Sequence, residues 1–122
     1  MTTKKKKILA WHFVKQDGTP ANGKPVKARA GQIRRHSGKL ELCSSGLHAS
    51  KSPLDALGYA PGFIVCRVEC SGKILEDNDK LVCSVREVLW IADSKTVVLK
   101  WARECALDVL HLWPSVPTVV RH

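Results

Sequence analysis

Cysteine and histidine are the side chains of this sequence best suited to act as nucleophiles, bases or metal ligands. Cys43 and His48 are close enough in sequence to suggest a nucleophile and a base, but nothing around them identifies an orienting acid, so a core or loop role is favoured. Cys66 and Cys70 suggest a metal-binding pair, yet in a strand four residues of rise separate them by about 13 Å. Zinc ligands must each lie about 2.3 Å from the ion, so we expect these two cysteines to be buried core thiols.

Positive charge suggests a second kind of chemistry, the binding of phosphate or carboxylate groups. The formal net charge is +9, and it falls by four to +5 when Lys4, Lys5, Lys6 and Lys7 are set aside as a solvating tail. Residues 24–39 carry basic side chains and no acid. These basic residues are Lys24, Lys27, Arg29, Arg34, Arg35 and Lys39. We predict that this segment is a surface that binds nucleic-acid phosphates or an acidic protein.

The tryptophans suggest a further possibility, the stacking of nucleic-acid bases beside lysine and arginine. They are Trp11, Trp90, Trp101 and Trp113. All lie within apolar patterns, and helical periodicity places at least Trp101 in the core, so we expect stacking to be secondary. The sequence argues against a nucleoside triphosphatase, because residues 58–62 contain Pro61 and no Lys-Ser or Lys-Thr follows them.

The elements that must position these side chains begin with strands. Residues 8–14 are apolar and aromatic, and turn-forming residues follow at 16–23, which predicts a strand and then a loop. Residues 26–35 are compatible with one edge strand, and residues 40–43 alternate like a short, half-buried strand.

A loop and a short helix are predicted next. Residues 46–50, Gly-Leu-His-Ala-Ser, are expected to form the loop, with His48 as the residue of most obvious chemical use. Pro53 suits the first position of a helix, and Ser52 can cap it. Gly58 lies near the predicted end of this helix.

The rest of the chain predicts strands followed by a longer helix. Residues 63–70 form the most secure strand, residues 73–76 a short one after a turn, and residues 81–91 another. Residues 94–113 repeat apolar side chains every three or four positions, which predicts an amphipathic helix packed against the sheet. The expected fold class is therefore α+β, with a mostly antiparallel or split β-sheet, one short helix and a C-terminal amphipathic helix.

The size of the chain, 122 residues, favours one domain, with a flexible basic tail at 1–7 and an extended tail at 115–122. No apolar run approaches the roughly 18 to 20 residues that cross a bilayer, and the start lacks the features of a secretory signal. The five cysteines are an odd number without a disulfide framework, which favours free thiols. We expect a cytoplasmic protein of the cell that makes it, with no membrane partner.

A set of motifs covers nearly the whole chain. The strongest is Leu-Cys-Ser-Ser-Gly-Leu-His-Ala-Ser at 42–50, which is followed by matching segments at 53–57, 59–62 and 67–70. Shorter matches lie at residues 8–13, 79–82, 89–90 and 111–113. Through these motifs the sequence resembles a family of small bacteriophage and prophage domains of uncharacterised function. This resemblance implies a phage context, with a host cell as the setting, and supplies no activity.

The order of elements also resembles the core of the ADP-ribosyltransferases. That resemblance implies NAD as cofactor, an early histidine that positions it, a middle residue that packs on the nicotinamide, and a late glutamate. The matching positions are His12, then His48 or Tyr59, and Glu87. In such an enzyme the carboxylate stabilises positive charge that develops on the ribose. Each residue also has a structural interpretation, such as a buried histidine bonded to backbone or a tyrosine that anchors a helix.

These observations support two functional hypotheses. The leading one is a phage-type accessory domain that binds a host or viral macromolecule, either nucleic acid or an acidic protein surface, through residues 24–39, and interferes with host processes. The alternative is an ADP-ribosyltransferase-like enzyme that uses NAD, or an inactive descendant of one. Whether the chain is an enzyme stays open on the sequence, no metal ligand set is predicted, and a cofactor is implied only under the alternative.

Overall fold

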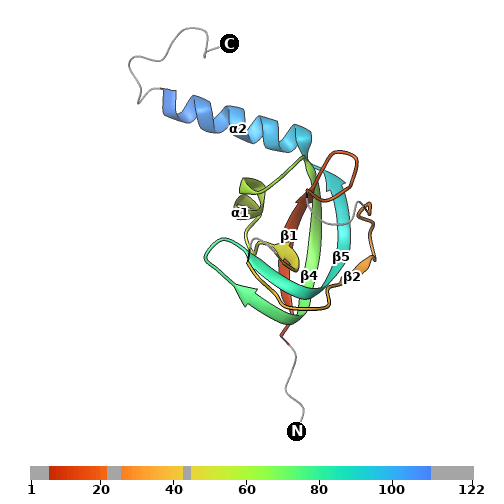
Figure 1. The fold of residues 1–122 in the computed structure, drawn as a ribbon. Coiled ribbons are helices and arrows are strands. Elements are labelled where there is room, and N and C mark those ends of the chain that lie inside the picture. The colour runs from red at the N-terminus through yellow and green to blue at the C-terminus, as the bar shows by residue number, and fades with distance from the viewer. Residues whose placement is uncertain (1–5, 22–25, 43–44, 111–122) are drawn as a thin grey trace.

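The computed structural model describes residues 6–21, 26–42 and 45–110, with the side chains of 109 and 110 left aside. The elements, in chain order, are β1 (Ile8–Val14), β2 (Ile33–Arg35), β3 (Leu47–Ala49), α1 (Pro53–Gly58), β4 (Ile64–Glu76), β5 (Leu81–Asp93) and α2 (Lys95–Leu110) (Figure 1). The fold is α+β, as predicted. Its sheet is antiparallel in every described pairing, and it has one short helix and one C-terminal helix.

Two long strands, β4 and β5, lie at the centre of the sheet. The order of paired strands is β1-β4-β5-β2, and β3 also pairs with β5. Strands β2 and β3 share one edge of β5: residues 47–49 pair with 81–83, and residues 33–35 pair with 85–87. The predicted turn at 71–72 is an irregularity within β4, whose pairing with β5 shifts between Ser71 and Ile74.

The sheet closes on itself through one bridge. The Trp11 amide donates to the Ser50 carbonyl oxygen at 2.7 Å, and the Ser50 amide donates back to the Trp11 oxygen at 2.9 Å. Ser50 directly follows β3, so this bridge links β3 to β1 and completes a ring of β1, β4, β5 and β3. Short backbone bonds of this kind satisfy groups that would otherwise lie unpaired at the two strand edges.

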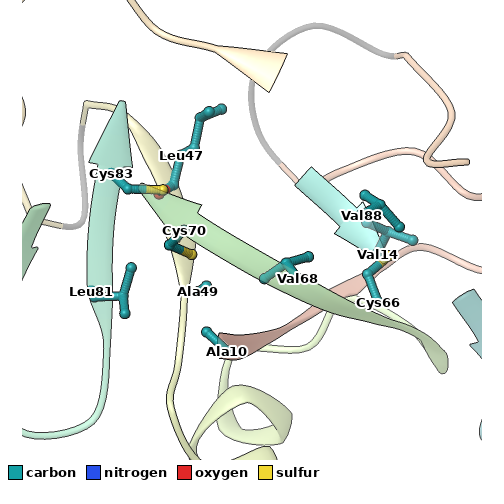
Figure 2. Close-up of a cluster of buried hydrophobic side chains, with 10 residues drawn as sticks. All are labelled: Ala10, Val14, Leu47, Ala49, Cys66, Val68, Cys70, Leu81, Cys83 and Val88. Atoms are coloured by element: carbon teal, nitrogen blue, oxygen red, sulfur yellow. The ribbon is translucent and has the colours of Figure 1, made fainter. Parts of the chain in front are cut away.

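The main core fills the interior of this ring. Figure 2 shows its ten buried side chains together, contributed by β1, β3, β4 and β5. Fully buried aliphatic residues such as Val14, Val68 and Leu81 each contribute roughly 1.5–3 kcal/mol of hydrophobic stabilisation. Cys66 and Cys70 are buried members of this core with free thiols, as predicted from their spacing. A second, smaller core lies where α1 packs on β1 around Phe13 and Ala56.

Two short elements differ from the predictions. Residues 47–49 form a strand rather than a loop, because their amides and carbonyls pair with β5. The short strand predicted at 40–43 is reduced to one bridge between Glu41 and Ser45, and Cys43 lies outside the described residues. Helix α1 begins at Pro53 as predicted, although Ser52 makes no side-chain capping bond in the structure.

Helix α2 does not pack against the sheet, contrary to the prediction. Figure 1 shows it extending from the end of β5, away from the strands. From Lys95 to Asp108 every residue except Val98 is exposed, and Trp101, predicted to be buried, is 44% exposed. Periodicity identified the helix correctly, but the direction of the chain after Asp93 decides what its apolar face meets. Within the described residues neither helix is long and apolar enough to span a bilayer.

Candidate functional site

A pocket of about 1000 Å³ opens beside the ring of strands. Its walls come from β1, the segment around β2, residues 45–50, the end of α1, and β5. This volume is at the upper end of the range for small-molecule sites, which is about 300–1000 Å³. The pocket lies at the edge of β5 with which both β2 and β3 pair, so segments that are far apart in the sequence line it together.

Arg86 on β5 is the most unusual residue of the pocket. Its side chain lines the pocket, yet the residue is only 5% exposed. One guanidinium nitrogen, Nη1, donates to the His48 carbonyl oxygen at 2.6 Å, whereas Nε is buried and has no hydrogen-bond partner among the described residues. Burial lowers the pKa of Arg86 from its usual value, which is the direction expected for a charge removed from water.

Arg34 lies directly opposite Arg86 in the pairing of β2 with β5. Side chains at directly opposed positions share one face of a sheet, and like charges there repel. Both arginines line the pocket, together with Arg35 and Lys80. Across the described part of the chain no aspartate or glutamate lines this pocket, and neither arginine forms a salt bridge.

Three buried thiols, those of Cys66, Cys70 and Cys83, lie near Arg86. Burial raises the pKa of Cys66 to about 11, which keeps it protonated at neutral pH. The pKa of Cys70 is raised as well, mainly by its hydrogen bond to Cys83 and by burial. The pKa of Cys83 is lowered, mainly by that same hydrogen bond and further by the charge of Arg86, and its thiol donates to the Leu47 carbonyl oxygen at 3.4 Å.

His12 on β1 lies on the same face as the core. It alternates with the buried residues Ala10 and Val14, and it is paired in register with Cys66. Its pKa is well below the usual 6.5, because burial disfavours the charged ring and the positive charges of Arg86, His48 and Arg34 oppose it further. His12 is therefore neutral at pH 7. Its Nε2 atom is buried and has no hydrogen-bond partner in the part of the chain that the structure describes.

His48 on β3 also lines the pocket and is half-buried. Burial lowers its pKa, and Arg86 lowers it further. The preceding Gly46 explains why this stretch of chain can lie so close to β5. Gly46 has a φ of +117°, and an added Cβ would overlap Val82 and lie 2.8 Å from a Leu40 methyl group.

Tyr59 caps α1 and places its ring at the pocket. Its hydroxyl donates to Asp79 Oδ2 at 2.6 Å, and this bond is the main reason that its pKa is raised. The Lys80 ammonium lies 5.3 Å from the centre of the ring. Tyr59 therefore contacts both Asp79 and Lys80, and the tyrosine and the lysine both line the pocket.

Three of the four residues matched to ADP-ribosyltransferases, His12, His48 and Tyr59, line this pocket, and Glu87 does not. The reason lies in β5. The core residues of β5 have odd numbers in its first part, Leu81 and Cys83, and an even number in its second part, Val88. The alternation of inward and outward side chains therefore shifts by one residue beside the irregular pairing at residues 71–74. Arg86 consequently faces the pocket, and Glu87 lies on the other face, paired with Glu69.

Only part of the predicted basic segment, residues 24–39, lines the pocket. Arg34 and Arg35 line the pocket, whereas Lys27, Arg29 and Lys39 are exposed outside its lining. Lys24 lies outside the described residues. Among the described residues no group of three or more histidine, cysteine, aspartate or glutamate side chains gathers as a metal site.

Sequence reasoning missed Arg86, Lys80 and His36, which all line the pocket. No sequence pattern marks Lys80 or His36 as pocket residues. Arg86 is marked weakly, as an arginine inside the apolar segment 81–91, but strict alternation from Leu81 assigns its side chain to the outer face of the strand. Only the changed parity of β5 turns it inward.

Comparison with known proteins identifies a family but no function. Residues 8–100 match the family model described as Domain of unknown function (DUF7666). No curated protein and no solved structure matches the chain.

Proposed function

We propose that this chain, which belongs to the DUF7666 family of domains of unknown function, binds single-stranded nucleic acid and holds one of its phosphates in the pocket. The observation that supports this proposal best is Arg86. It is a buried arginine beside an open pocket, and no described carboxylate neutralises it.

The energetics of Arg86 favour an anionic ligand. Removing an arginine from water costs several kcal/mol even after relaxation, and the one hydrogen bond to His48 offsets only part of that. A phosphate group would offset the remainder, because the guanidinium fork matches two phosphate oxygens. Arg34, directly across the strand pair, would be relieved of repulsion by the same anion.

The surface beyond the pocket favours a polymer over a small anion. Lys27, Arg29 and Lys39 are exposed and belong to the same segment as Arg34 and Arg35, so the positive charge continues past the pocket walls. A strand with regularly spaced phosphates can contact both the pocket and this surface. The guanidinium fork matches carboxylates as well as phosphates, so the preference for nucleic acid over an acidic protein rests on the regular spacing of the phosphates. The resemblance to phage domains suggests that this nucleic acid is encountered in the cytoplasm of an infected cell, where binding would interfere with host processes.

Fluorescence anisotropy with internally labelled single-stranded DNA and RNA tests the proposal. Charge reversal in the double variant Arg34→Glu/Arg35→Glu is expected to weaken binding by about tenfold or more. The slope of log affinity against log salt should become shallower by about 1.4, since each contact to a single strand contributes about 0.7. The matched control is Lys95→Glu/Lys100→Glu, which reverses two exposed charges on α2. If both double variants bind alike, the proposed surface is wrong.

A second candidate, the binding of NAD, is supported by the meeting of His12, His48 and Tyr59 in one pocket. Because Glu87 lies on the other face of β5, the arrangement favours an inactive descendant of an ADP-ribosyltransferase over an active one. Isothermal titration calorimetry with NAD tests binding, and release of nicotinamide tests catalysis. Absence of both signals would remove this candidate.

A further inference from the structure

We infer that the pocket recognises the phosphorylated end of a nucleic-acid strand, a phosphate monoester, rather than a phosphodiester within it. This inference rests on the proposed function and adds a substrate class to it. It depends on the burial of Arg86 and on the charges and hydrogen-bonding atoms of the residues that line the pocket.

The burial of Arg86 is the first argument. Arg86 lines the pocket, is 5% exposed and is bonded to the His48 carbonyl. A phosphodiester continues into the strand on both sides, so to bring its phosphorus close to a buried guanidinium it would have to bury a nucleotide on each side. A terminal phosphate carries a nucleotide on one side only.

Charge is the second argument. A phosphate monoester carries about −1.5 to −2 charges at pH 7, whereas a diester carries one. Arg34 and Arg86 face each other across β2 and β5 and present two guanidinium groups, and the described pocket wall contains no acidic residue. The second negative charge of a monoester therefore has a partner of its own.

The unpartnered atoms are the third argument. His12 Nε2 and Arg86 Nε are both buried without hydrogen-bond partners, and both residues line the pocket. A buried polar atom that stays unpaired destabilises the folded state, so two such atoms at one site indicate a missing partner. Arg86 Nε donates, and the neutral His12 ring can donate or accept according to its tautomer. A terminal phosphate has three free oxygens, against two in a phosphodiester, and so offers one more acceptor to the donors of Arg86, Arg34 and His12.

The test compares three forms of one short oligonucleotide, labelled at an internal base. One form carries a 5′-phosphate, one a 3′-phosphate, and one hydroxyls at both ends. We expect one phosphorylated form to bind at least about tenfold more tightly than the unphosphorylated form. Inorganic phosphate and a mononucleoside monophosphate serve as competitors. Both should compete more weakly than the phosphorylated strand, because they lack contacts to Lys27, Arg29 and Lys39.

Two variants locate the recognition in the pocket. Arg86→Lys keeps the charge and removes the fork, and Arg34→Gln removes one charge from an exposed-edge strand without touching the core. Each should abolish most of the preference for the phosphorylated end, whereas Lys95→Gln on α2 should retain it. Circular dichroism confirms that each variant is folded, and Arg34→Gln provides the test if Arg86→Lys does not fold.

The outcomes separate the two proposals. Equal affinity for all three forms overturns the inference while the proposed function survives. Equal competition by the mononucleotide also overturns it and identifies a free nucleotide as the ligand. Failure of every oligonucleotide to bind refutes the proposed function itself.

Discussion

Replacing Arg86 by methionine should stabilise the protein while it removes anion binding. Methionine has a similar length, is unbranched, and carries no charge. Arg86 lies between core residues of β4 and β5, so the new side chain would extend the buried apolar cluster. A buried charge that lowers the stability of the fold is best explained by a ligand.

The expected magnitude follows from two opposing terms. The variant loses the hydrogen bond from Arg86 Nη1 to the His48 carbonyl, which contributes about 1.5–3 kcal/mol as a bond to a charged group. It also loses the desolvation cost of an arginine that has no described carboxylate partner, which is several kcal/mol. Replacement of buried ionic groups by apolar ones stabilises proteins by about 1–4 kcal/mol in favourable cases. We expect a gain in the lower half of that range, because the lost hydrogen bond from Arg86 offsets part of it.

Urea unfolding at neutral pH and low salt measures the change in the free energy of unfolding. A gain of 1 kcal/mol should also raise Tm by about 4 °C for a protein of this size. Arg67→Met is the matched control, since Arg67 lies on β4 but stacks over the Trp11 ring at 4.4 Å and is half-buried. Its loss should be neutral or mildly destabilising.

Adding inorganic phosphate tests whether Arg86 binds an anion. A ligand that binds only the folded state stabilises it by RT ln(1 + [L]/Kd), so phosphate should raise the Tm of the parent protein and of Arg67→Met but not that of Arg86→Met. If Arg86→Met lowers the free energy of unfolding by more than about 2 kcal/mol in the absence of anions, Arg86 is a structural residue and the reasoning fails.

The remaining predictions concern the glycine of the motif, the buried histidines and the thiols. Gly46→Ala should destabilise the fold by about 2–4 kcal/mol in urea unfolding, because its Cβ would overlap a neighbouring side chain at a positive φ, whereas Gly58→Ala, with open space around it, should not. Since burial lowers the pKa of His12, the unfolded chain takes up a proton below about pH 6.5 that the folded state refuses, so stability should fall as the pH falls from about 7.5 to 5.5. His12→Gln should flatten that pH dependence, and an unchanged slope would contradict the assignment. Iodoacetamide followed by mass spectrometry should label the exposed Cys105 and spare Cys66, whose pKa is about 11, until denaturant is added; rapid native labelling of Cys66 would be inconsistent with its burial.

Local features of the chain were enough to predict most of the elements. Alternating side chains identified β4 and β5, turn residues separated β1 from the next strand, and Pro53 marked the start of α1. The burial of Cys66 and Cys70 was predictable because residues an even number of positions apart in a strand lie on the same face. These predictions succeeded because each depends on residues within a few positions of one another.

The candidate site was predictable only in part. His12, His48 and Tyr59 were selected together through a resemblance, and Arg34 and Arg35 through charge, and the structure places all five on one pocket. That these two groups share a site was not foreseen, because the pairing of β2 and β3 with the same edge of β5 brings them together.

Tertiary structure alone decided which charge faces the pocket and where α2 lies. Alternation along β5 is a local rule, and the irregular pairing between Ser71 and Ile74 of β4 accompanies a change in its parity, so Arg86 turns inward and Glu87 outward. Periodicity shows that a helix has an apolar face, but not which surface covers it, and α2 leaves that face exposed. The sequence by itself thus determined most of the elements and a set of basic and imidazole side chains. The register between strands, which is a property of pairs of segments, determined the site that they form.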